Sequence, residues 1–451
     1  MAAAPRQFPQ APHGTHRPQL PDWPRVMSAS SQHDTDGKTP PEGARPDPYR
    51  AFRLPDFRNL VTATFLAGLA SQMQAVAVGW DVYERTGSAM ALGWVGLAQI
   101  TPVILLFLPA GQIADRHDRR KIIIASLGLA MLAAAALTYA GFSGASVGWL
   151  YLACAAGSAA QTINRPSRQA LLPSVVPVPM LENAMTWSSG AFQLAAVAGP
   201  ALAGLLIASA NSAAAVYAVS LALLGLALLF ASRIKRPPFI SKPSERSWRD
   251  LFAGVRHVWG TQVILAVISM DLLAVLFGGA TALLPIYAKD ILQVGPTGLG
   301  WLAAATPAGA CLMVIAQGHL PPSKNAGARF LWAVAGFGVA TIVFGLSTTF
   351  WLSMLALAAI GALDNISVVT RQTVVQSHTP DALRGRVSSV NSVFISTSNE
   401  LGAFESGLVA SFTTPVFAVV SGGIATVLLV AAGAKAFPQL RRMKSLIGPG
   451  T

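Results

Sequence analysis

GQIADRHDRRK, residues 111–121, is a short polar turn between two long apolar stretches, 89–113 and 121–141. Each stretch has the roughly 20 residues that a helix needs to cross about 30 Å of hydrocarbon. The turn is rich in arginine and lysine, which is typical of loops on the cytoplasmic side of a membrane. The segment therefore predicts a pair of membrane-spanning helices joined by a cytoplasmic turn.

The composition of the whole chain agrees with a membrane protein. Of 451 residues, 53% are hydrophobic and only 11% are charged, whereas soluble domains carry about 25% charged residues. A net charge of +13 would suggest nucleic-acid binding in a soluble protein. Here the charges lie between apolar blocks, so we expect a lipid bilayer, and no nucleic acid, as a partner. Cys154 and Cys311 lie in apolar runs far apart in the sequence, where packing roles without a disulfide are expected.

Twelve apolar blocks follow one another, which predicts an all-α membrane protein with twelve transmembrane helices. They cover about 59–83, 89–113, 121–141, 147–168, 184–209, 212–232, 263–288, 297–318, 328–347, 350–371, 387–411 and 415–435. We expect two six-helix halves, 59–232 and 263–435, joined by a cytoplasmic linker, 233–262. Residues 1–58, rich in Pro, Gly, Ser and charge, predict a disordered cytoplasmic tail with one candidate interfacial segment near Tyr49–Phe57, and residues 436–451 form a second tail.

The basic residues predict the orientation of the chain. With the amino terminus in the cytoplasm, all of the 32 Lys and Arg residues except Arg85 and Lys289 fall on the inner side. Basic residues concentrate in cytoplasmic loops. We therefore expect a monomeric, multi-pass protein of the plasma membrane, the bacterial inner membrane, with both termini in the cytoplasm.

The two predicted halves share an internal repeat. At a shift of 203 residues, Arg168-Gln169 matches Arg371-Gln372, Ser174 matches Ser377, Pro177 matches Pro380, Gly199 matches Gly402 and Gly204 matches Gly407. At a shift of 207 residues, Leu92-Gly93-Trp94 matches Leu299-Gly300-Trp301. Two related six-helix halves are the architecture of one large class of secondary transporters.

The polar turn at 111–121 has a specific spacing. Gly111 and Asp115 are four residues apart and share one helix face, and a glycine there permits a neighbouring helix to approach closely. Asp115 would lie at the membrane edge, able to pair with Arg116, Arg119 or a neighbouring helix end. Together with Arg120, these residues resemble the loop signature of the major facilitator superfamily, which often has glycine where this chain has Asp118. The resemblance extends over about 57–435; it implies the major facilitator fold, and we expect this turn to act as a gating motif.

Three further stretches resemble bacterial exporters of the enterobactin exporter type. They are YERTGS at 83–88, RPSRQALLP at 165–173 and RGRV at 384–387. This resemblance implies export of a small molecule, siderophore-like or drug-like, in exchange for protons. The second half has QGHLP at 317–321 where the gating motif would place its acid, a departure that is common in the second copy of that family.

Small residues recur in the fifth block, at Ala195, Gly199, Pro200 and Gly204. One explanation is a packing face with a proline kink. The other is the Gly-Pro motif that antiporters of the superfamily carry on this helix, which this chain retains with alanine at 195 and 203. On either explanation Gly199 and Pro200 have structural or conformational roles.

Four acidic residues inside predicted helices of the second half are candidates for proton coupling: Asp271, Asp364, Glu400 and Glu405. A charge at mid-membrane costs roughly 2.5–3.5 kcal/mol, so it is rarely accidental. Asp271 ranks first, because no base lies near it in the sequence and an acid buried without a partner is stable mainly when protonated. A hydrogen bond to a neighbouring helix is the competing explanation. Glu400 and Glu405 are five residues apart, so at most one is expected to face a central cavity.

The matched arginines, Arg168 and Arg371, are expected to have structural roles by pairing with acids or lipid. The first half supplies neutral polar groups to its predicted helices: Gln72, Gln99, Gln161 and Asn164. Helix packing explains any one of them. As a group they suit a water-filled cavity that binds a small-molecule substrate through hydrogen bonds.

These features predict a secondary active transporter that exports a small molecule in exchange for protons by alternating access. Uptake of a nutrient or lipid is the alternative, and a non-transporting membrane receptor or scaffold is the alternative from another class. The sequence has no paired metal ligands, nucleophile elbow or nucleotide-binding loop. We therefore expect no enzymatic activity, no cofactor and no metal.

Overall fold

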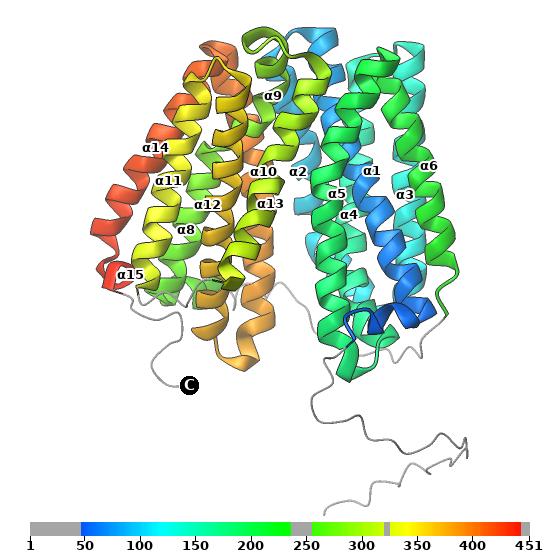
Figure 1. Cartoon of the computed structure of the whole chain (residues 1–451). Coiled ribbons are helices and arrows are strands. Elements are labelled where there is room, and N and C mark those ends of the chain that lie inside the picture. Colours follow the sequence, from blue (N-terminus) through cyan, green and yellow to red (C-terminus); the bar gives the residue numbers. More distant parts are fainter. Residues whose placement is uncertain (1–46, 236–254, 320–324, 443–451) are drawn as a thin grey trace, which may run out of the picture. The chain divides into compact units, whose positions relative to one another are not determined.

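The computed structural model describes residues 47–235, 255–319 and 325–442, and all regular elements within these ranges are helices (Figure 1). Residues 1–46 of the predicted first tail lie outside the described residues. So do residues 236–254 of the predicted linker and 443–451 of the predicted second tail. The predictions for those segments stay predictions.

Six long helices form the first half: α1, Pro55–Thr86; α2, Ala89–Arg116; α3, Arg119–Ser143; α4, Val147–Val175; α5, Leu181–Ala210; and α6, Ala213–Ser232. Their ends follow from local chemistry. Gly87 and Gly144 end α1 and α3 with φ values of 60° and 66°, in the left-handed region that glycine adopts without strain. The hydroxyls of Ser88 and Ser212 accept hydrogen bonds from backbone amides at the starts of α2 and α6.

The second half repeats this plan with an interrupted first helix. That helix consists of α8, Gln262–Phe277; η3, Gly279–Leu283; α9, Leu284–Ile286; and the π-helical turn η4, Tyr287–Ile291. It is followed by α10, Gly295–His319; α11, Ala326–Leu346; α12, Phe350–Ser377; α13, Asp381–Phe412; α14, Pro415–Ala436; and the short α15, Pro438–Arg442. The interruption, which the sequence analysis did not predict, lies at Gly278-Gly279, where added Cβ atoms would come within 2.5 Å of a Phe337 ring carbon and 2.3 Å of the Gly402 carbonyl oxygen. The predicted all-α fold is confirmed, and the described residues contain twelve long helical segments in two sets of six.

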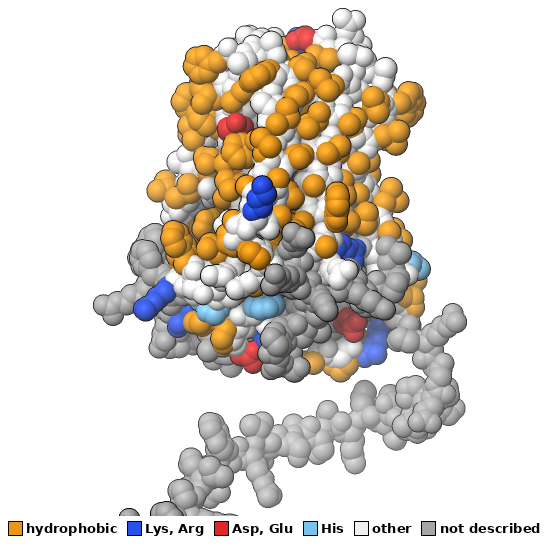
Figure 2. Space-filling model, turned by 90° about the vertical axis from the view of Figure 1, so that its left-hand side faces the viewer, with side chains coloured by type: hydrophobic (Ala, Val, Ile, Leu, Met, Phe, Trp, Pro, Cys, Tyr) orange, Lys and Arg blue, Asp and Glu red, His pale blue; other side chains and the backbone are white. Residues whose placement is uncertain are grey.

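Ten of these helices are long and apolar enough to cross a membrane by composition alone. The two described helices that complete the twelve, α4 and α13, carry most of the polar and charged residues that line the cavity described below, which lowers their mean hydropathy. Apolar side chains cover most of the face of the helices seen in Figure 2, and most charged side chains gather near one end of it. This distribution suits helices surrounded by lipid.

The most extensive contacts between the two halves are made by two helix pairs, α2 with α13 and α5 with α10. A Cβ added to Gly407 would lie 2.7 Å from Gly93 Cα, and one added to Gly300 would lie 2.9 Å from Gly204 Cα. These are one contact made twice, because the repeat matches Gly93 with Gly300 and Gly204 with Gly407. All four glycines lie toward the ends of their helices that the predicted topology places outside the cell. At those ends the two halves are packed backbone to backbone.

The end of the predicted first tail is ordered. Residues 50–53 form the 3₁₀ turn η1, and α1 begins at Pro55, four residues before the predicted start of the first helix. The candidate interfacial segment packs on α5: the side chains of Asn183 and Trp187 both donate to the Pro48 carbonyl, and the Phe52 and Trp187 rings meet edge to face at 4.9 Å. The predicted disorder of 1–58 therefore does not extend to residues 47–58, because aromatic side chains there find an apolar surface to cover.

Candidate transport cavity

A cavity of about 1340 Å³ is lined by residues from all six helices of the first half, α1 to α6, and by α13 of the second. Ligand pockets commonly measure roughly 300–1,000 Å³, so this cavity has room for a drug-sized molecule together with water. It is lined down to Gly111, Gln169 and Gly385, which lie toward the predicted inner ends of α2, α4 and α13. All four predicted cavity residues, Gln72, Gln99, Gln161 and Asn164, line it.

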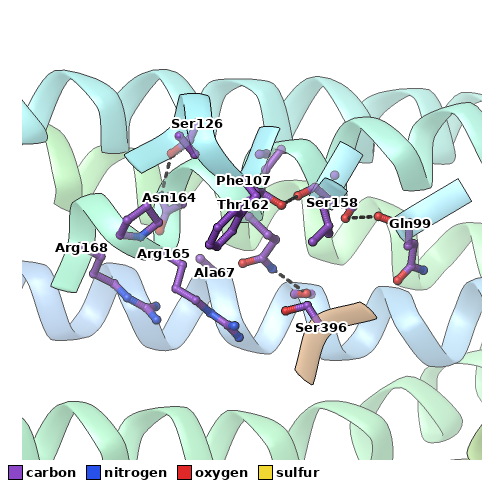
Figure 3. A pocket seen from close by; sticks show the side chains of 18 of the residues that line it. Ala67, Gln99, Phe107, Ser126, Ser158, Thr162, Asn164, Arg165, Arg168 and Ser396 are labelled. Atoms are coloured by element: carbon purple, nitrogen blue, oxygen red, sulfur yellow. Dashed lines mark hydrogen bonds between the residues drawn. The ribbon is translucent and has the colours of Figure 1, made fainter. Parts of the chain in front are cut away.

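Hydrogen bonds hold part of this polar lining in place (Figure 3). The Gln161 side-chain amide donates to Ser71 Oγ at 2.8 Å, and the Asn164 amide donates to Ser126 Oγ at 2.7 Å. Ser158 Oγ donates to the Gln99 carbonyl at 2.7 Å. These three side chains of α4 therefore bond to neighbouring helices and also line the cavity. Helix packing and cavity lining both explain them.

Glu400 is the one carboxylate among the described residues that line the cavity. It lies on α13 where α2 crosses it, because a Cβ added to Gly96 would come within 2.6 Å of the Glu400 carbonyl oxygen. Glu405 is not among the lining residues, and its carboxylate accepts a 3.3 Å hydrogen bond from Ser406. Of the two acids, Glu400 therefore lines the cavity and Glu405 does not.

Asp271 ranked first from the sequence because no base lies near it, but in the structure it has a basic partner. The fold brings Arg371, 100 residues away in sequence, into an ion pair with its carboxylate. Ser367, one turn earlier on α12, donates a 2.5 Å hydrogen bond to the same carboxylate. Both ionic side chains are almost wholly buried, with 3% of each residue exposed. Asp271 is thus a paired structural acid in this conformation, and Arg371 has the acid partner that was expected of it.

Asp364 lies one turn before Ser367 on the same face of α12, beside the ion pair and outside the cavity lining. No hydrogen bond or ion pair joins it to another residue in the described ranges. The cluster of Asp271, Asp364 and Arg371 therefore holds two carboxylates for one guanidinium.

Arg168 differs from its repeat partner. It lines the cavity together with Arg165, and Figure 3 shows both side chains extending in the same direction from α4. Neither guanidinium has a hydrogen bond or an ion pair with any residue that the structure describes. Among the described residues, Arg168 therefore has no acid partner of the kind that was expected for it.

The basic turn after α2 joins three helix ends. Arg119 Nη1 donates to the Ala170 carbonyl near the end of α4 at 2.9 Å, and Arg120 donates to the Ser232 carbonyl at the end of α6. Cations at helix C-termini satisfy unpaired carbonyls there. Asp118, the departure from the family pattern, caps α3 by accepting from the Arg120 amide at 3.0 Å. Arg116 is exposed, and the side chain of Asp115 lies outside the described residues.

Gly199 and Pro200 lie where α5 meets two other helices. A Cβ added to Gly199 would come within 2.6 Å of Gln72 Cβ on α1, and the Pro200 carbonyl oxygen would lie 2.6 Å from a Cβ added to Gly300 on α10. These contacts are those of a packing face. A specific antiport role for the pair remains a prediction.

A polar contact across the halves, which the sequence analysis missed, lies at the predicted outer end. The Tyr83 hydroxyl on α1 donates to the Asp290 carboxylate on η4. Lys289 Nζ lies 5.8 Å from the ring centroids of both Trp80 and Tyr83, within cation–π range. The other predicted outer base, Arg85, pairs with Asp81 at 2.7 Å. The only sequence signal for the Tyr83 contact was its place in the exporter-like stretch 83–88.

Within the described residues, no group of three or more His, Cys, Asp and Glu side chains is placed to hold a metal ion.

Two six-helix halves, related by a repeat and enclosing a polar cavity, define a secondary transporter of the major facilitator fold. The chain belongs to the family described as transmembrane secretion effector, whose model matches residues 47–447. It is therefore a membrane transporter of the major facilitator superfamily and not an enzyme.

Among curated proteins, the chain is similar to the enterobactin exporter EntS of Escherichia coli and of Shigella boydii. Each is 25% identical over 396 residues, covering 86% of this chain and 94% of the relative. Solved structures share the fold. The nucleoside transporter NupG has a TM-score of 0.68 at 13% identity, covering 85% of this chain and 100% of its own. A bacterial homologue of the human lysosomal transporter Spinster, in an inward-facing and unoccupied conformation, has a TM-score of 0.62 at 16% identity, covering 88% and 100%.

Proposed function

We propose that this protein exports a small molecule from the bacterial cytoplasm in exchange for protons, acting as a monomer of the inner membrane with both termini inside. The observation that carries the proposal is the single described carboxylate in the cavity wall, Glu400. A proton carrier must reach the same compartment as the substrate if the two flows are to be coupled. Of the four acids predicted from sequence, Glu400 is the one that lines the cavity.

The position of Glu400 suits such a role. It lies on α13 beside the α2 contact, so it is close to the surface along which the halves must separate and rejoin. When the cavity opens to one side, water solvates the carboxylate and favours its ionised form, and enclosure between the halves favours the protonated form. In the inward-open state the solvated carboxylate releases its proton to the cytoplasm and the substrate enters the cavity. In the outward-open state the substrate leaves and the carboxylate takes up a proton, so substrate and proton move in opposite directions.

Asp271 is less suited to carry the exchanged proton. An acid held by Arg371 and Ser367 is already neutralised, and protonating it would leave the arginine buried without a counter-charge. The proposal therefore places coupling at Glu400, with Asp364 and Glu405 as the next candidates. Asp271 and Arg371 instead fix α8 against α12.

Two observations support export by alternating access. The 25% identity to an enterobactin exporter over most of both chains favours export over uptake. The packed glycine contacts at the predicted outer ends, together with a cavity that reaches the predicted inner ends, suit a state that takes up its substrate from the cytoplasm. The size of the cavity suits a siderophore-like or drug-like molecule.

A panel of candidate substrates in inverted membrane vesicles tests the proposal. With an imposed pH gradient, acidic inside, we expect accumulation of the exported substrate that collapses when an ionophore removes the gradient. Glu400→Gln should abolish gradient-driven accumulation and retain exchange of substrate across the membrane without a gradient. The matched control is Glu405→Gln on the same helix, which should keep both activities. Full gradient-driven transport by Glu400→Gln would remove Glu400 from the proposal, and accumulation that ignores the gradient would contradict proton exchange itself.

A further inference from the structure

The matched arginines of the two halves, Arg168 and Arg371, lie in different environments. Arg371 is buried against Asp271, whereas Arg168 lines the cavity. The positions on α1 that correspond to Asp271, at repeat shifts of 203 and 207 residues, are Gly68 and Thr64. Neither can pair with an arginine as an acid does. In the second half, Asp271 neutralises Arg371. In the first half, α1 has no acid at the corresponding position, so it does not neutralise Arg168.

A second arginine reinforces this charge. Arg165 lies three residues before Arg168, so the two guanidinium groups share one helix face with Gln161, which is four residues before Arg165. All three residues line the cavity. Figure 3 shows both arginines extending from α4 toward the same side. Neither has a hydrogen bond or ion pair with a described residue, so up to ten N–H donors are available to a ligand.

The remainder of the lining does not neutralise the pair. Glu400 is the only carboxylate among the lining residues that the structure describes, and the other polar lining groups are amides, hydroxyls and the guanidinium of Arg386 on α13. Phe107 on α2 and Phe192 on α5 add aromatic surface to the same cavity. Planar guanidinium groups bind carboxylate, sulfonate and phosphate groups through paired hydrogen bonds and also stack on aromatic rings.

We propose that the transported substrate carries an anionic group, and that Arg165 and Arg168 bind that group as an anion clamp on α4. This proposal rests on the transport function proposed above and narrows its substrate to acidic, partly aromatic molecules. Gln161, Asn164 and Gln99 supply hydrogen bonds to the neutral part of the molecule. Glu400, on the facing half, disfavours a second anionic group at that side of the cavity unless the carboxylate is protonated.

A cysteine reporter measures the clamp without knowledge of the natural substrate. The chain has only two cysteines, so Cys154→Ala and Cys311→Ala give a background in which Gln161→Cys is the single thiol. The purified protein in detergent, with no pH gradient, is treated with an anionic methanethiosulfonate (sulfonatoethyl) and a cationic one (trimethylammonioethyl). We expect the ratio of anionic to cationic reaction rates to fall about tenfold or more when Arg165→Gln and Arg168→Gln are combined.

Protection of the same thiol from a neutral maleimide tests binding directly. Fluorescein, an anionic xanthene dye, should protect saturably, and rhodamine 123, a cationic dye of the same frame, should not. Each arginine-to-glutamine variant should raise the half-protecting concentration of fluorescein about tenfold, the loss expected for one charge-assisted hydrogen bond. Arg165→Lys and Arg168→Lys, which keep the charge, should retain the preference for fluorescein even if the glutamine variants fold poorly.

The matched control is Arg58→Gln, which removes an equal charge from an exposed residue of α1 outside the cavity lining. It should leave both the rate ratio and the protection unchanged. Equal protection by the two dyes, no protection by fluorescein, or arginine variants with unaltered protection would overturn the anion clamp. Because no proton gradient is present, these outcomes are independent of whether Glu400 couples transport to protons.

Discussion

Gly204→Ala should move the transporter out of the conformation described here. A Cβ at residue 204 would lie 2.5 Å from the Pro296 carbonyl oxygen, 2.8 Å from Gly300 Cα and 2.9 Å from the Gly300 amide nitrogen. All three atoms belong to the backbone of α10, so no side-chain rotation relieves the overlap. The clash arises only where α5 of one half packs on α10 of the other, and it disappears once these ends separate.

The magnitude follows from two opposing effects. Overpacking of a close contact costs about 1–3 kcal/mol. Alanine also favours a helix over glycine by roughly 1 kcal/mol, but this gain is the same in every conformation and cancels between them. The difference of about 1–3 kcal/mol corresponds to a roughly 5- to 150-fold shift of the conformational equilibrium toward the state that is open at the predicted outer end.

Accessibility of the cavity from outside measures this shift. With Gln161→Cys as the single thiol, an impermeant methanethiosulfonate added to intact cells reacts only through the outward-open state, so its rate should rise by about the same factor while that state is the minor one. Gly190→Ala, on the same helix with no atom within 4 Å of the new Cβ, should leave the rate unchanged. A folded Gly204→Ala protein with the rate of its parent would refute the view that the glycine contacts close the outer end.

Four other substitutions or labels test separate parts of the structure. Asp271→Ala leaves Arg371 buried without a partner and should cost about 3–5 kcal/mol of stability, seen as loss of the monodisperse peak in detergent chromatography. The double variant Asp271→Leu with Arg371→Met should restore most of that peak. Equal loss of the peak in both variants would show that the ion pair is not the cause. Tyr83→Phe removes the hydrogen bond to Asp290 and should increase outside labelling of the cavity about tenfold; no increase would mean that this contact does not hold the outer end closed. Asp115→Asn should leave the amount of protein in the membrane unchanged and slow turnover, measured as transport rate per molecule, because a charge-assisted contact of one conformation is lost; an unchanged rate would remove the turn from gating. Single cysteines at 146, 211 and 348 should react with impermeant reagents from outside, and those at 118 and 245 only from inside; outside labelling at 245 would contradict the six-plus-six topology.

The sequence was sufficient to predict the helices because their determinants are local. Blocks of apolar residues of the right length, separated by Gly, Ser and Pro, define each span, and most observed helices extend only a few residues beyond the predicted blocks. The cavity amides could also be predicted, since a neutral polar group in an apolar helix must find a partner or water. The pairing of Asp271 with Arg371 could not. When a helix is apolar on nearly all faces, the sequence gives no preferred direction of rotation about its axis, so it does not determine which acid faces which base.

The asymmetry of charge between the halves has a consequence for coupling. In the second half the arginine of the repeat is neutralised within the helix bundle, and the half presents a carboxylate, Glu400, to the cavity. In the first half the same arginine has no acid opposite it and faces the cavity beside Arg165. Under the proposals made above, one half carries the proton site and the other carries the substrate site. Neither half can then couple the two flows alone: exchange requires that a substrate bound at α4 and a proton held by Glu400 exclude each other within the one cavity that α4 and α13 share. Coupling would therefore depend on the same approach of α4 and α13 that alternating access brings about.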